Sequence, residues 1–274
     1  MSDQPDRLRL GGMALANGLL VHGPTHWAAA VVDDDGEMVV GSGPKPRLAL
    51  GPLDTVPIAR GIIRMAEAMM MVPAARSGVP EARLAMEDRP AGVIVLGTMA
   101  VAAIARRRIR SVVWQELVAT TVSVLPVLIM LRQSPVSRWH AVEHKSIAAY
   151  ERAGAAGLAT NGTDPKEHTR CGSNLVLPLM VSGALGNIAA RAVRGRGRRA
   201  LVRASALAVG IGASVEAFAF AERNPNHPVS RVIHGAGHAI QAGFVTREPN
   251  AEELAVGRAA IEALLRVETM GAPA

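Results

Sequence analysis

Hydrophobic and polar positions change their spacing along the first third of the chain. Residues 11–48 alternate short apolar runs with Gly and Pro, and the segment DDDGE (33–37) contains the Asp-Gly pair of a hairpin turn. This pattern predicts a β-rich N-terminal segment over residues 1–55. Over residues 56–76 the apolar spacing becomes helical, and one face collects Ile58, Ile62, Met65 and Met69. We therefore predict an amphipathic helix and a linker over residues 56–90.

Four longer apolar segments follow, at residues 91–105, 111–131, 175–193 and 200–220. The second is long enough to cross a bilayer, the first is short, and polar residues interrupt the others. Their connectors, RRRIR and RGRGRR, are tight and basic, so the segments pair as two helical hairpins with positive turns. In a membrane, the positive-inside rule would place these turns in the cytoplasm and the intervening loop outside. The alternative is a soluble Ala-rich bundle whose basic turns lie in water.

The predicted fold is mainly α, with two Ala-rich helical hairpins, either membrane-embedded or a buried bundle, and a small N-terminal β-rich segment. The helical core covers residues 91–220 and includes a polar helix and a loop at 132–173. Residues 221–274 form a C-terminal helical segment. Pro249, Asn250 and a pair of glutamates mark the start of its last helix.

Composition and charge narrow the classes of function. The formal net charge is +7, yet aromatic residues make up only 3% of the chain, so the rings that stack on bases are nearly absent. We therefore expect no nucleic acid partner and favour a membrane, the inner (cytoplasmic) membrane, with the side of the site undecided. The single cysteine, Cys171, excludes an internal disulfide. No apolar signal-peptide region is visible at the N-terminus.

The stretch RWHAVEHKSIAAYE (138–151) carries the clearest chemical signal. On a helix, His140 and His144 lie four residues apart and can meet one cation, with Glu143 beside them. The order H-x-x-E-H is that of the inverted zinc peptidases, in which the glutamate is the general base. The alternative interpretation is a solvated helix face that also includes Lys145.

A zinc site for catalysis needs a third protein ligand and one open position. We predict Glu216 as this ligand, because a carboxylate within the apolar run GIGASVEAFAF needs a partner for its charge. The alternative is that Glu216 pairs with Arg203 or Arg223. The segment HTRCG supplies His168 and Cys171, each a possible ligand; we expect Cys171 to lie beside the ion rather than bind it. His234 and His238 share the spacing without an acid, and we interpret them as packed helix residues.

Several stretches together resemble the YqhQ-like family of bacterial and plastid proteins of unknown function. They are GGMALANGLLVHGP (11–24), VPIARGIIRMAEAMMM (56–71), WHAVEHKSIAAYE (139–151), HTRCGSNL (168–175), GIGASVEAFAF (210–220) and TREPNAEELAVGRAAIEAL (246–264). Members are often described as predicted metal-dependent enzymes and multi-pass membrane proteins. The resemblance implies that the polar set of the family comprises His140, Glu143, His144, His168, Cys171 and Glu216.

The chain also departs from the pattern of the family. Asn17 and His22 stand where relatives commonly carry an acid and a base, and Thr169 stands within a form that elsewhere contains proline. These differences imply a different substrate or a specialised role. We expect Asn17, His22 and Arg60 on the substrate side of the site.

Two functions from different classes follow from these observations. The first is a membrane-associated metal-dependent enzyme, with zinc as the expected divalent ion, held by His140, His144 and Glu216 and with Glu143 as the base. Its reaction is hydrolysis of an amide or ester, or a lyase, isomerase or cyclase reaction at the same site, on a small or lipophilic molecule. The second is a non-enzymatic membrane scaffold or assembly factor with a structural polar cluster. Membrane lipid is an expected partner of either, and a homo-oligomer is left open.

Overall fold

The N-terminal segment is a four-stranded antiparallel sheet, as the alternating pattern predicts. The computed structural model describes residues 7–84, 97, 100–101, 103–104 and 108–270. Strands β1 (Gly11–Ala14), β2 (Gly18–His22), β3 (His26–Val32) and β4 (Met38–Pro44) lie in the order of the chain. The predicted Asp-Gly turn joins β3 to β4, where Gly36 has a φ of 84° that favours glycine.

Helices form nearly all the rest of the described chain. They are α1 (Ala59–Gly78), α3 (Val112–Gln133), α4 (Val136–Ala153), α5 (Val176–Arg191), α6 (Arg196–Arg223), α7 (Pro228–Ile240) and α8 (Ala251–Met270). Short 3-10 turns η1 (Gly51–Asp54), η2 (Gly154–Thr163) and η3 (Gly172–Leu175) and a π-helical turn η4 (Gln241–Val245) connect them. The chain is therefore mainly α with a small N-terminal sheet, which confirms the predicted fold class.

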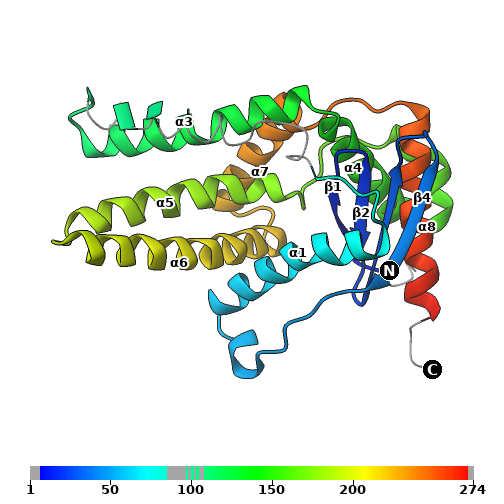
Figure 1. Ribbon diagram of the computed structural model, residues 1–274, viewed down its shortest axis with the longest axis horizontal. Coiled ribbons are helices and arrows are strands. Elements are labelled where there is room, and N and C mark those ends of the chain that lie inside the picture. Colours follow the sequence, from blue (N-terminus) through cyan, green and yellow to red (C-terminus); the bar gives the residue numbers. More distant parts are fainter. Residues whose placement is uncertain (1–6, 85–96, 98–99, 102, 105–107, 271–274) are drawn as a thin grey trace.

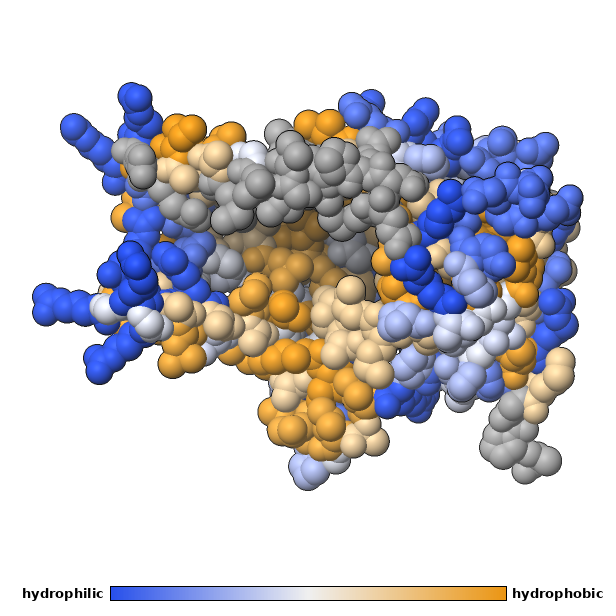
Figure 2. All heavy atoms as spheres, viewed as in Figure 1, coloured by the Kyte–Doolittle hydropathy of each residue, from blue (hydrophilic) through white to orange (hydrophobic). Residues whose placement is uncertain are grey.

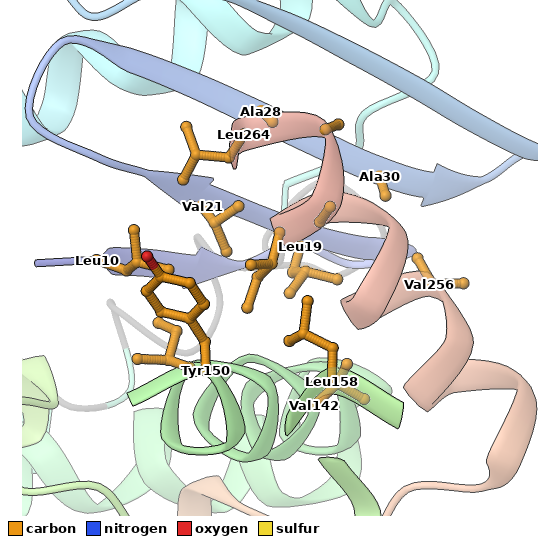
Figure 3. Packing of buried hydrophobic residues seen from close by; sticks show 14 of the residues in the cluster. Leu10, Leu19, Val21, Ala28, Ala30, Val142, Tyr150, Leu158, Val256 and Leu264 are labelled. Atoms are coloured by element: carbon orange, nitrogen blue, oxygen red, sulfur yellow. The ribbon is translucent and has the colours of Figure 1, made fainter. Parts of the chain in front are cut away.

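The sheet is the middle layer of the domain that carries the polar motif. One face packs on α4 and α8 through a cluster that includes Leu19, Val21, Val142 and Leu264 (Figure 3). The other face packs on α1, where Leu20 and Trp27 meet Met71. Alternation along β2 sends Leu19 and Val21 to one layer and Leu20 to the other, because successive side chains of a strand point to opposite faces.

Helices α3, α5 and α6 extend away from the sheet as a separate arm (Figure 1). Helix α5 packs along α6 and also contacts α3. Two helical segments are long and apolar enough to cross a membrane, Gly172–Arg191 and Arg196–Arg223, and only about a fifth of each is buried. This finding supports membrane association. The predicted segment 91–105 lies largely outside the described residues.

The basic turn between α5 and α6 lies at the end of the arm that is farthest from the sheet (Figure 1). Hydrophilic residues gather at this end, and apolar residues cover the arm between it and the domain (Figure 2). Exposed apolar side chains on the arm include Val181, Leu185, Leu201, Leu207 and Val209. Water is a poor environment for so much apolar surface, and hydrocarbon is a favourable one.

Candidate metal centre

Helix α4 carries the H-x-x-E-H motif through the interior of the domain. Its residues from Ala141 to Ile147 are all buried, including Glu143, His144 and Lys145. The Nζ atom of Lys145 donates to the carbonyl oxygens of Gly162 and Asp164, at 3.1 and 2.8 Å, and so is tied to the loop that covers the helix. The interpretation of this stretch as a solvated helix face is therefore wrong.

Backbone carbonyls fix the two motif imidazoles at Nδ1. The Nδ1 atom of His140 lies 3.1 Å from the carbonyl oxygen of Val245, and that of His144 lies 2.6 Å from the oxygen of Lys166. Because each carbonyl can only accept, each Nδ1 carries the proton and each Nε2 keeps a lone pair. The Nε2 atom of His144 is buried and has no hydrogen-bond partner within the described part of the chain. Leaving such an atom unpartnered costs about 1–3 kcal/mol.

Cys171 supplies the third donor atom beside these nitrogens. Its Sγ lies 3.2 Å from Nε2 of His140, and one donor atom from each of His140, His144 and Cys171 lies within 4.8 Å of the others. A tetrahedral zinc ion with ordinary bond lengths separates its sulfur and nitrogen ligands by about 3.6 Å. The 3.2 Å between Sγ of Cys171 and Nε2 of His140 is close to this value, so the chemistry of the three donors is that of a zinc site.

Glu143 lies at the edge of this cluster. Its Oε2 is 3.9 Å from Nε2 of His140, too far for a hydrogen bond. Strand β1 approaches it closely, since a Cβ added to Gly12 would lie 2.7 Å from Cγ of Glu143. Burial raises the pKa of the Glu143 carboxyl. A buried carboxyl of raised pKa is suited to accept and return a proton.

Burial sets the electrostatics of the whole cluster. It raises the pKa of the Cys171 thiol to about 11, with a further contribution from Glu143. It lowers the pKa of His144, and the neighbouring His140 lowers it further. Each shift favours the uncharged form of its group. The backbone N–H of Ser173 approaches Sγ of Cys171 at 3.4 Å, in an orientation that also stabilises a thiolate.

His168 stands behind the cluster. Its ring centroid lies 5.7 Å from that of His144, its Nε2 lies 3.2 Å from Glu151, and its Nδ1 accepts from the backbone N–H of Arg170 at 3.2 Å. Arg170 also forms an ion pair with Glu151. Both ring nitrogens of His168 are thus engaged, and the residue shapes the segment that holds Cys171.

Glu216 is not brought to the histidines. Arg60 on α1 holds its carboxylate with two hydrogen bonds, at 3.0 and 2.5 Å. The charge that the sequence pattern marks as needing compensation is therefore compensated by a guanidinium, and by neither Arg203 nor Arg223 through a hydrogen bond. The group of metal-competent donors contains Cys171 in the third position instead.

The expected substrate-side residues separate into two places. Asn17 bridges the sheet and the segment after α1, donating to the oxygens of Val32 and Glu81 and accepting from the N–H of Arg83. His22 and Arg60 line one cavity, which also lies against α6. Asn17 therefore links two segments of the fold and does not line the cavity, whereas His22 and Arg60 share the same cavity wall.

A family model for a protein of unknown function, DUF1385, matches residues 90–267. The chain belongs to this family. The matched region contains α3 to α7 and most of α8, and with them His140, Glu143, His144 and Cys171. The sheet and α1 precede it. No curated protein and no solved structure matches the chain.

Sequence reasoning missed two parts of the site in this DUF1385 member. These are the carbonyl oxygens of Lys166 and Val245, which orient the imidazoles. Main-chain atoms leave no residue-type signal, so no motif could have revealed them. Cys171 did carry a signal, as the only thiol in the chain, and its segment was marked as a source of ligands.

Proposed function

We propose that this DUF1385 member is a membrane-associated metal-dependent enzyme that binds one divalent ion through His140, His144 and Cys171. The carrying observation is the pair of imidazoles held at Nδ1 by backbone carbonyls, with Nε2 of His144 buried and unpartnered and Sγ of Cys171 beside Nε2 of His140. Orientation of ligating histidines by such partners is typical of metal sites. Two nitrogens and a thiolate favour zinc.

Glu143 is the general base in this proposal. A divalent ion in the cluster would acidify water and polarise a carbonyl group of the substrate. The Oε2 atom of Glu143 lies 3.9 Å from Nε2 of His140, and Glu143 is not one of the three clustered donors, which supports a role as base rather than ligand. Hydrolysis of an amide or ester is the simplest reaction for these groups. A lyase, isomerase or cyclase reaction on a lipophilic molecule uses the same base and the same polarised oxygen. The resemblance to YqhQ-like proteins, which are often described as predicted metal-dependent enzymes, supports this assignment.

The helical arm supports a location at the cytoplasmic membrane. Its apolar length ends in the turn that carries Arg194, Arg196, Arg198 and Arg199. The positive-inside rule places this turn in the cytoplasm. The sheet and α4, the helix that carries His140 and His144, lie at the opposite end of the arm (Figure 1), and we therefore assign them to the outer face of the membrane.

The first experiment measures metal in the full-length protein after purification in neutral detergent. We expect about one equivalent of zinc in the wild type. Cys171→Ser should weaken zinc binding by more than the roughly 10- to 100-fold typical of losing an outer partner of a ligand. Glu216→Gln is the matched control, because Glu216 belongs to the ion pair with Arg60 and should keep its zinc.

Alkylation of the single cysteine is a second, independent measurement. In the zinc-loaded protein Cys171 should resist a maleimide, and chelation should make it reactive. Equal labelling of folded protein before and after chelation would remove Cys171 from the ligand set.

Glu143→Gln separates base from ligand. The amide keeps the shape of the side chain but cannot accept the proton, so zinc should stay bound. Turnover of any ester or peptide found by screening should fall by roughly 100-fold or more. Loss of zinc in this variant would contradict the assigned role.

The second candidate is a non-enzymatic membrane scaffold or assembly factor. The observation that favours it is the number of contacts by which the polar residues of α4 tie down the loop after it, such as His144 to Lys166 and Lys145 to Gly162 and Asp164. A folded wild-type protein that is free of metal after gentle purification would support this function and contradict the enzyme.

A further inference from the structure

A cavity of about 950 Å³ lies between α1, the last turns of α6 and the edge of the sheet. None of His140, His144 and Cys171 lines it. Strand β1 separates the cavity from the metal cluster. A Cβ added to Gly11 would lie 2.8 Å from the imidazole of His22, on the cavity side, whereas one added to Gly12 would meet Glu143 on the other side. The two sites are therefore distinct.

The polar part of the cavity wall has an excess of positive charge. It contains six lysine and arginine residues and three acids, and two of the arginines are occupied: Arg9 pairs with Glu222, and Arg60 pairs with Glu216. Among the others, Arg64 and Arg223 form no direct ion pair with another described residue, although both act at longer range on the carboxylate of Glu216. A cavity whose wall has more cations than acids attracts an anion.

His22 and Lys45 lie in contact at the wall of this cavity. Nζ of Lys45 lies 3.0 Å from Nδ1 of His22. Burial lowers the pKa of Lys45, and the nearby Arg47 lowers it further. Burial and Lys45 lower the pKa of His22 to about 4, although Glu268 acts in the opposite direction. Burial thus accounts for most of both shifts, and the cations that face each other, Lys45 with His22 and Arg47 with Lys45, add to them.

The rest of the wall is apolar. Ile63 and Met71 of α1 and Val215 and Phe218 of α6 contribute to it. Helix α6 is one of the two that are long and apolar enough to cross a membrane, and the cavity meets it at the end away from the basic turn. Apolar residues also cover α6 and the neighbouring part of α1 on the outer surface (Figure 2). The cavity therefore stands where lipid headgroups meet the hydrocarbon if the arm is inserted.

We propose that this cavity binds an anionic membrane lipid, with the phosphate at Lys45, Arg47 and Arg64 and the first part of the acyl chain against Phe218 and Ile63. Guanidinium and ammonium groups form strong charge-assisted hydrogen bonds with phosphate oxygens. A lipid satisfies both halves of the wall, whereas a soluble phosphate uses only the basic half. The assignment rests on the membrane association proposed above and is independent of the metal.

The test uses the full-length protein in neutral detergent and follows its thermal unfolding during titration with three compounds. These are dioctanoyl phosphatidic acid, dioctanoyl phosphatidylcholine and glycerol 3-phosphate. We expect phosphatidic acid to raise the midpoint in a saturable manner, and the other two to need at least about tenfold higher concentrations. A similar response to phosphatidylcholine would overturn the role of charge. A response to glycerol 3-phosphate as strong as that to the lipid would assign the cavity to a soluble phosphate ester and overturn the lipid.

Variants connect the response to the cavity. Lys45→Gln combined with Arg64→Gln should raise the half-saturating concentration of phosphatidic acid about tenfold or more. Lys45→Arg keeps the charge and should retain binding, which shows that the fold tolerates a change at this position. Arg258→Gln removes one exposed arginine on α8, remote from the cavity lining, and should have no effect. An unchanged titration in the double variant would contradict the proposal.

The membrane assignment can fail separately. Recovery of the chain from the soluble fraction without detergent would contradict insertion of the arm. The titrations would then still decide whether the cavity prefers a lipid over a soluble phosphate. Zinc content enters neither measurement.

Discussion

Acidification below pH 6.5 should destabilise the folded protein through His22. Its pKa falls from 6.5 to about 4 because the ring is buried and lies beside Lys45. Between these values the unfolded chain binds more protons than the folded chain, so the free energy of unfolding rises with pH. Above about pH 6.5 the ring is neutral in both states and the stability is unaffected. As the pH falls from there towards 4, the folded protein loses more and more of its free energy of unfolding.

The size of this effect follows from the same values. The pKa of His22 falls by about 2.5, from 6.5 to about 4, and each pKa unit corresponds to about 1.4 kcal/mol. The free energy of unfolding therefore changes by at most about 3 kcal/mol. His22 is only partly buried, and solvent screening reduces the expected loss to about 1–2 kcal/mol. Lys45 is the cation in contact with the ring, and Glu268 is the acid that acts on it from α8.

The assay is denaturant unfolding of the full chain in detergent at several pH values between 7.5 and 4.5. His22→Gln replaces the ring by a neutral polar group, so the wild type should lose about 1–2 kcal/mol more than this variant over that range. Glu268 does not disturb the comparison. Although burial raises its pKa, hydrogen bonds from Thr25 and His26 lower it overall, so its contribution is lost only below about pH 4.5 and in both proteins. His238→Gln, at an exposed position of α7, is the control and should follow the wild type. Parallel pH profiles for wild type and His22→Gln would refute the reasoning.

Two further predictions concern the helical arm. Gly212→Leu should lower the free energy of unfolding by about 1–3 kcal/mol or prevent folding, because a Cβ there would lie 2.2 Å from a backbone oxygen of the segment before α1; Gly183→Ala on α5, where nothing lies within 4 Å of the added Cβ, should be neutral or slightly stabilising in the same thermal scan. The second prediction concerns topology and uses a Cys171→Ala background with one introduced cysteine. A cysteine from Gly197→Cys in the basic turn should react with an impermeant maleimide only after the cells are opened, whereas one from Glu252→Cys at the start of α8 should react in cells whose outer barrier is permeable. The reverse labelling pattern would show that the topology is inverted.

Local periodicity determined the elements and two of the three residues of the His140–His144–Cys171 cluster. His140 and His144 lie on one face because a helix turns every 3.6 residues, and the strand pattern with its Asp-Gly turn specified the small sheet. These relations hold within a few residues of the chain. The sequence also indicated that the carboxylate of Glu216, within an apolar segment, needs a partner for its charge, and Arg60 is that partner.

Tertiary structure decided the partners. Arg60 reaches Glu216 from 156 residues away and uses the carboxylate that the pattern suggested for the metal. Cys171 lies beside the two histidines because the segment after η2 folds back over α4, and two main-chain oxygens orient the imidazoles. Spacing along the chain cannot rank such pairings, because each depends on which surfaces bury the most apolar area together. The sequence therefore determined the types of ligand available at this site, and packing of α1, α4 and α6 selected among them.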